Sequence, residues 1–306
     1  MSTAVSTERD AGAAGTAAVT RATLLVMFSA CCFGSIAIFV TVATRTGARL
    51  MDLLAWRYLL GAVLLRLVSG GVRGVRMPPG RATRLLVLGG GGQALVAGTT
   101  LSALRYIPVA TLTFLFYSYP AWVALIGAMR GTEPLTGRRV IALVLSLAGI
   151  GVMVGMPGGG LDVIGVVLAL VGALLYALYI PLFGHLGEGL APSVTSAYTA
   201  AGAAIIFAAI AISHGGPSMA MSPVAWAMVG LLAVVSTGLA FLAFLRGLAV
   251  IGPVRTAIVS TIEPFWAALF ASLALGQQLS PRVLGGGVLI AAAVVILNLR
   301  SRSTPA

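Results

Sequence analysis

Ten runs of apolar residues recur along this chain of 306 residues, and most reach the ~20 residues with which an α-helix crosses a bilayer. The runs cover residues 23–43, 53–69, 84–104, 109–129, 138–155, 163–183, 193–213, 224–245, 253–275 and 281–299. Only 8% of the residues are charged, whereas a soluble domain carries roughly a quarter. The alternation of a membrane β-strand is absent. The sequence therefore predicts an all-α integral membrane protein with ten transmembrane helices.

The charged residues predict how the chain is oriented. All 19 basic residues are arginines, and the net charge of +12 comes mostly from the connections between apolar runs. If the N-terminus lies inside, fourteen arginines fall on the inner side and five on the outer side, as the positive-inside rule requires. We therefore expect a multi-pass protein of the plasma (inner) membrane, with residues 1–21 and 301–306 as cytoplasmic tails, the first of them disordered. This distribution argues against nucleic-acid binding.

The two halves of the chain resemble each other. A shift of 144 residues places Pro120 over Pro264 and Trp122 over Trp266, and further on Arg138 over Arg282. Each half, 22–156 and 161–300, contains five runs. Because five is odd, the second half must enter the membrane with the opposite orientation, an arrangement that suits alternating access.

Two segments carry a resemblance to a known family. YPAWVALIGAMRGTEPLTGRR and EPFWAALFASLALGQQLSPRV are similar to the half-ending patterns of the EamA-like branch of the drug/metabolite transporter superfamily, and WRYLLGAVLL resembles its second helix. The resemblance implies two inverted five-helix repeats and export of a small metabolite, without a cofactor. It also implies a glutamate after the fourth run of each half. Glu133 matches this pattern, whereas Gln277 departs from it.

Glu263 is the single acid of the run 253–275. An ionisable group at mid-membrane depth is costly and by default marks a functional site. At helical spacing Thr256 and Ser260 lie on its face, so we expect this polar stripe to face a cavity. Glu263 would then recognise a cation or carry a proton. The alternative is a neutral carboxyl that bonds to a neighbouring helix.

The first half has Tyr119 in the position of Glu263. Together with Phe116 it predicts an aromatic wall opposite the acid, which suits a cationic or amphipathic solute; simple helix packing is the alternative. Pro120 and Pro264 each remove a backbone donor and predict a helix bend in each half, against ordinary tolerance of proline in membrane helices.

The remaining candidate residues are weaker. Arg57 is interpreted either as a ligand for an anionic group or as a side chain that snorkels to the interface. Glu133 predicts an ion pair with neighbouring arginines at the cytoplasmic rim, with gating as a second role for this position and for Gln277. Further cavity candidates are Gln93, Tyr176 and Tyr179.

Other classes of protein fit less well. His185 and His214 fall in or beside connections on opposite sides of the membrane, and no nucleotide-phosphate loop occurs, so metal catalysis and ATP-driven pumping are disfavoured. The sequence predicts a secondary transporter, not an enzyme, that moves an amino-acid-like or amphipathic compound and is coupled to protons if Glu263 titrates. An intramembrane enzyme, a channel or a structural membrane protein are the alternatives. The partners expected for this protein are the small-molecule substrate and the lipid bilayer, and the formation of a homodimer is left open.

Overall fold

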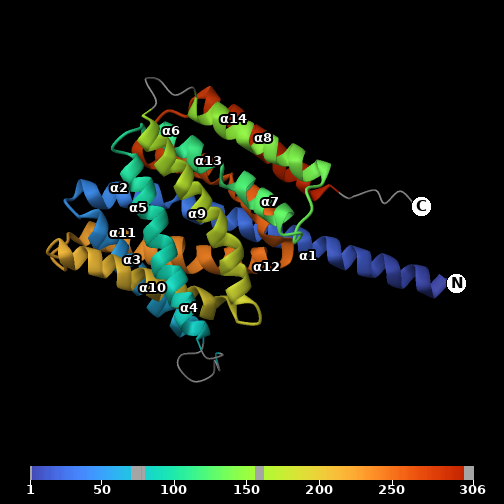
Figure 1. The fold of residues 1–306 in the computed structure, drawn as a ribbon, viewed down its shortest axis with the longest axis horizontal. Helices are drawn as coiled ribbons and strands as arrows, with labels where there is room; N and C mark the ends of the chain where they lie inside the picture. The colour runs from blue at the N-terminus through green and yellow to red at the C-terminus, as the bar shows by residue number, and fades with distance from the viewer. Residues whose placement is uncertain (1, 70–76, 78–79, 156–161, 300–306) are drawn as a thin grey trace.

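The computed structural model describes residues 2–69, 77, 80–155 and 162–299, and the regular elements in those ranges are all helical (Figure 1). The first half contains α1 (Ser2–Gly34), α2 (Ile36–Arg45), α3 (Leu50–Val68), α4 (Arg81–Val87), the π-helical turn η1 (Leu88–Gly92), α5 (Gln93–Ala103), α6 (Val109–Phe116), α7 (Tyr119–Met129) and α8 (Gly137–Val154). The second half contains α9 (Val163–Gly187), α10 (Pro192–Ser213), α11 (Pro223–Ala233), η2 (Val234–Leu239), α12 (Ala240–Ser260), α13 (Glu263–Leu275) and α14 (Pro281–Asn298).

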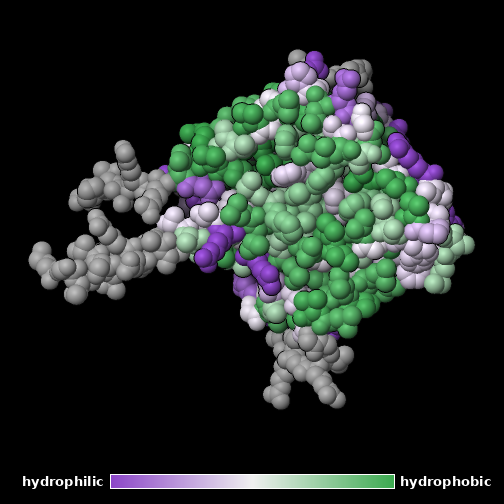
Figure 2. Space-filling view, turned by 180° about the vertical axis from the view of Figure 1, so that it is seen from behind, coloured by the Kyte–Doolittle hydropathy of each residue, from purple (hydrophilic) through white to green (hydrophobic). Residues whose placement is uncertain are grey.

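Eight helices in the described ranges are long and apolar enough to cross a membrane. Some of them combine consecutive elements, such as Gly15–Arg45 and Pro223–Ser260. α3 has 19 residues but carries Asp52, Arg57 and Arg66. The space-filling view shows mostly apolar surface on one face, with hydrophilic residues gathered toward its edges (Figure 2). Such a surface is typical of a protein that packs against lipid.

The N-terminal segment differs from the sequence-based expectation. Residues 2–21 are helical and continuous with the first apolar run, whereas the sequence-based expectation was a disordered tail. The physical reason is composition, because residues 11–18 consist mainly of alanine, the strongest helix former. Residues 301–306 lie outside the described ranges.

Short polar side chains define where several helices begin. Thr136 and Asp162 accept hydrogen bonds from backbone N–H groups in the first turns of α8 and α9. Ser222 and Ser280 do the same for α11 and α14. Each side chain satisfies one of the N–H groups that a helix start leaves without a partner. Helix pairs then form the body of the protein, with α3 against α10, α8 against α14, and α1 against α12.

A break in the helix precedes each of the two repeat-related prolines. α6 ends at Phe116 and α7 begins at Tyr119, while α12 ends at Ser260 and α13 begins at Glu263. The break residues 117–118 and 261–262 are again 144 positions apart. Pro120 and Pro264 sit in the first turn of the new helix, where a missing N–H costs nothing. Tyr119 and Glu263 therefore become the first residues of half-length helices.

Two further irregularities occur within the helices. The glycines at 89–92 lie in the π-helical turn η1, which continues the helix from α4 into α5. The runs 224–245 and 253–275 both contribute to α12, which extends from Ala240 to Ser260 across a kink. Within α12 the backbone leaves the helical region at Gly252, with φ 76° and ψ 168°, a conformation that side chains with a Cβ rarely adopt.

Candidate functional site

A cavity of about 240 Å³ lies between helices of both halves. Nine of its thirteen lining side chains are aromatic, two are charged and one is an amide. They are Phe33, Ile36, Arg57, Tyr58, Gln93, Phe116, Tyr119, Tyr176, Tyr179, Phe183, Phe241, Phe244 and Glu263. An aromatic chamber with few polar groups is the usual form of a site for a small organic molecule.

Glu263 enters this cavity from the first turn of α13. Gly34 of α1 permits the approach, because a Cβ at this position would lie 3.0 Å from the Glu263 carbonyl oxygen and 2.9 Å from Trp266 Cβ. The Tyr117 side chain and the Arg57 guanidinium are polar groups that interact with the Glu263 carboxyl. The N-terminus of a helix also favours a negative charge. The local structure therefore supports a carboxylate at a depth where lipid alone would reject it.

Arg57, on α3 of the first repeat, donates two hydrogen bonds to the second repeat. Its Nε donates to Thr237 Oγ1 at 2.9 Å and its Nη2 to the Ser236 carbonyl oxygen at 3.0 Å. Both acceptors belong to η2, whose π-helical turn displaces backbone groups from regular pairing. The guanidinium also lies over the Tyr58 ring, with Cζ 4.9 Å from the ring centroid. The side chain is only 4% exposed, so the snorkelling interpretation of Arg57 is wrong.

The two charges of the cavity are not joined in an ion pair. Across the described residues, the side-chain pairs within 4.0 Å are Arg49–Asp52, Arg139–Glu133 and His185–Glu188. Arg57 Nη1 makes no hydrogen bond to a described residue. A buried charge requires a partner to offset its lost hydration. A solute that carries both an anionic and a cationic group would supply one to each side chain.

A row of aromatic rings connects the two sides of the chamber. Tyr119 meets Tyr176 edge to face with centroids 4.8 Å apart, and Tyr176 stacks on Tyr179 at 6.2 Å. Phe116 contacts Tyr176 at 5.5 Å. The Tyr119 hydroxyl donates to the Ala257 carbonyl oxygen at 3.4 Å, which ties α7 to α12. These rings offer apolar faces and the electron-rich surfaces that attract a cationic group.

The comparisons with known proteins decide the family. The model of the EamA-like transporter family matches residues 20–155 and again residues 163–299. The chain belongs to the EamA-like transporter family. It is 29% identical over 280 residues to the "Uncharacterized transporter YcbK" of Bacillus subtilis (strain 168), a match that covers 87% of this chain and 89% of that protein. A solved structure titled "Crystal structure of protein" has the same fold, with a TM-score of 0.76 at 22% identity, over 91% of this chain and 96% of that chain.

The cavity of this EamA-like protein brings together most of the residues that the sequence proposes for substrate binding. Seven of them line it: Glu263, Tyr119, Phe116, Gln93, Tyr176, Tyr179 and Arg57. Thr256 and Ser260 do not, because they are buried between helices at 0% and 6% exposure. The reason is the break at residues 261–262, which turns Glu263 away from the stripe that a continuous helix would form.

Several residues that line the cavity are not among those predicted from the sequence. Phe183 follows Tyr176 and Tyr179 at helical spacing on α9, so the same face could have been extended by one turn. Phe241 and Phe244 are three apart on α12 and offered a similar signal. Phe33 carried no signal, because nothing local distinguishes it from the lipid-facing side chains around it. Among the residues that the structure describes, no three or more His, Cys, Asp or Glu side chains are grouped so that they could hold a metal ion.

Glu133 connects the two repeats at one end of the molecule. Its Oε2 lies 2.7 Å from Arg139 Nη2, so the expected ion pair at this position is confirmed. Its Oε1 accepts a hydrogen bond at 3.1 Å from the backbone N–H of Val254, directly after the break at Gly252. A Cβ at Gly252 would lie only 3.1 Å from Oε1. Gln277, the counterpart of Glu133, is exposed.

Replacing Glu133 by alanine is expected to accelerate hydrogen exchange in the α12 segment after Gly252 by roughly 5- to 30-fold. The variant loses a helix-capping bond and a partly buried ion pair, which together contribute about 1–2 kcal/mol. Hydrogen–deuterium exchange with mass spectrometry measures the segment directly. Glu133→Gln is the matched control, because an amide oxygen still accepts from Val254 N–H, and it should show a smaller effect. Equal exchange in the wild type and Glu133→Ala would show that Glu133 does not stabilise the contact between the two repeats at this end of the molecule.

Proposed function

We propose that this EamA-like protein is a secondary transporter of a small amphipathic zwitterion, of the size and chemistry of an aromatic amino acid. The observation that carries the proposal is that Arg57 and Glu263 line one aromatic cavity without pairing with each other. Arg57 receives the carboxylate of the solute and Glu263 its ammonium group. The rings around Tyr176 receive its apolar part.

The proposed transport cycle uses two inverted repeats of five spans each. The first repeat consists of α1 with α2, α3, α4 with α5, α6 with α7, and α8; the second consists of α9, α10, α11 with the first part of α12, the rest of α12 with α13, and α14. The break at Gly252 supports a division of α12 between two spans. Both termini then lie in the cytoplasm of a plasma-membrane protein. Rocking of one repeat against the other exposes the cavity to each side in turn.

The Glu133–Val254 bond is the proposed closure on the cytoplasmic side. Its counterpart Gln277 marks the outer side, where an exposed amide stands in place of the carboxylate. Export is the proposed direction. Protonation of Glu263 is the proposed link to the proton gradient, because a carboxyl at this depth exchanges a proton with each change of access.

Uptake into proteoliposomes tests the proposal. The full chain is reconstituted, and entry of radiolabelled phenylalanine is measured in competition with unlabelled phenylalanine, its methyl ester or its N-acetyl derivative. We expect saturable uptake of the zwitterion and roughly 10- to 150-fold weaker competition by either derivative, because each leaves one charged side chain of the cavity without a partner. Equal competition by all three compounds would contradict the zwitterion assignment. Chemical turnover of a compound in detergent, without a sealed compartment, would favour an enzyme instead.

A further inference from the structure

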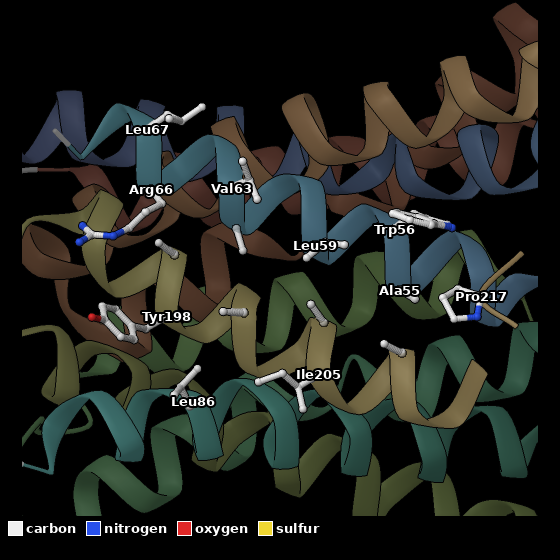
Figure 3. A pocket seen from close by; sticks show the side chains of 15 residues that line it. Ala55, Trp56, Leu59, Val63, Arg66, Leu67, Leu86, Tyr198, Ile205 and Pro217 are labelled. Carbon is white, nitrogen blue, oxygen red and sulfur yellow. The ribbon is translucent and has the colours of Figure 1, made fainter. Parts of the chain in front are cut away.

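A groove of about 590 Å³ runs along the surface between α3 and α10, separate from the central cavity (Figure 3). It shares no lining residue with that cavity. On α10 the groove is formed by alanines at helical spacing, namely Ala197, Ala201, Ala204 and Ala208. Their short side chains leave a depression along the helix, whereas larger residues would fill it. Leu86 of α4 contributes to the same lining.

The walls of the groove present apolar side chains to the surroundings. Val63 and Leu59 on α3 are 50% and 44% exposed, and Ile205 on α10 is 61% exposed. In a bilayer such a depression is filled by hydrocarbon, since no water is available at this depth. Its lining residues extend along α3 from Ala55 to Leu67, a direction that suits an acyl chain.

The two ends of the groove differ in chemistry. Figure 3 places Arg66 and Tyr198 at one end, and Trp56 and Pro217 at the other. Trp56 is fixed, because its Nε1 donates to the Ser218 carbonyl oxygen at 3.0 Å. Arg66, in contrast, donates only to Ser69 Oγ at 3.3 Å, and in the described part of the chain it forms no ion pair.

A second arginine lies toward the same end. Arg84 is exposed on α4, two residues before Leu86 of the groove, and within the described ranges it too has no ion pair. The helices α3 and α4 are consecutive, so the end of α3 and the start of α4 lie on one side of the membrane. Basic pockets between transmembrane helices at such a position bind the headgroups of anionic lipids.

We propose that this groove binds an anionic phospholipid, with one acyl chain between α3 and α10 and the phosphate on Arg66 and Tyr198. The guanidinium supplies the charge and a forked set of donors that matches phosphate oxygens. The Tyr198 hydroxyl adds a further donor at the same end. The occupant is a lipid and not a second copy of the chain, because the groove is concave and carries charge of one sign at its end.

Native mass spectrometry of the full chain tests the proposal. The protein, purified in a mild detergent, is incubated with equimolar phosphatidylglycerol and phosphatidylethanolamine, and the lipid retained on the protein is counted. The wild type is expected to retain phosphatidylglycerol preferentially. Arg66→Ala should lower its retention about five-fold, the factor that corresponds to ~1 kcal/mol per arginine at a membrane surface, whereas Arg66→Lys should keep most of it. Val63→Trp, which fills the groove from a half-exposed position, should lower retention of both lipids.

Two matched variants separate this site from general effects. Arg246→Ala removes an exposed arginine from α12, and Val288→Trp enlarges a side chain on α14 that is 68% exposed. Both should leave lipid retention unchanged, and thermal unfolding of each variant checks its fold. The proposal is overturned if both lipids are retained equally by the wild type, or if Arg66→Ala or Val63→Trp retains as much phosphatidylglycerol as its control. A dimer that Val63→Trp dissociates would assign the groove to a second copy instead.

Discussion

Replacing Glu263 by glutamine is expected to lower the uptake of a zwitterionic solute by roughly 10- to 150-fold. The variant keeps the shape of the side chain but removes the charge that receives the ammonium group, and a hydrogen bond to a charged group contributes about 1.5–3 kcal/mol. Because an amide cannot accept and release a proton, the variant should also lose any accumulation driven by a pH gradient. Counterflow at equal pH on both sides measures the binding defect, and uptake with a gradient measures the coupling.

Glu188→Gln is the matched control for Glu263. Glu188 is an acid with a side chain that is 71% exposed, and its Oε1 lies 3.4 Å from His185 Nδ1. It should transport as the wild type does. If Glu263→Gln transports normally with and without a pH gradient, the carboxyl is a structural group, and both the recognition role and the coupling role are wrong. Exchange that persists while accumulation is lost would separate coupling from recognition.

Replacing Arg57 by methionine is expected to abolish recognition of the solute carboxylate and to weaken the contact between α3 and η2. The side chain is 4% exposed and makes two hydrogen bonds to the second repeat, so its loss leaves the Thr237 hydroxyl and the Ser236 carbonyl without this donor. Breaking a buried charge interaction from one side typically costs about 3–5 kcal/mol. Uptake of the zwitterion should therefore fall by at least about 100-fold.

A test that distinguishes recognition from folding compares two substitutions. Arg57→Lys keeps the charge but cannot reproduce the fork of donors, so it should retain the fold and recover part of the uptake. Arg105→Met is the matched control, because Arg105 is exposed in a connection. If Arg57→Met transports the methyl ester and the zwitterion at the same reduced rate, Arg57 is structural and does not contact the carboxylate. A selective loss of the zwitterion supports the assignment.

Much of the architecture was readable in the sequence because its causes are local. Apolar runs of spanning length predict membrane helices wherever they occur, since hydropathy depends on the residues of the run alone. The prolines at 120 and 264 predicted irregular helices, and the structure places a break directly before each. The same breaks explain why the stripe of Thr256, Ser260 and Glu263 was too simple, because it assumed one continuous helix.

The N-terminal segment shows the limit of composition. Its small and polar residues suggested disorder, yet residues 2–21 continue α1. Alanine is favourable in a helix, and a helix already started by a membrane span extends at little cost because nucleation is complete. Polarity was thus a weaker guide than helix propensity at this end.

The partners of the charged residues were decided by tertiary structure. Arg57 bonds to residues 179 and 180 positions away, and Glu133 to a backbone group 121 positions away. No local pattern specifies such pairs, because they depend on how helices of one repeat pack against the other. Local sequence was sufficient for the helices, for the repeat and for the presence of an acid at membrane depth. Packing alone determined that Glu263 and Arg57 face one aromatic cavity, since the position of each side chain follows from contacts made far along the chain.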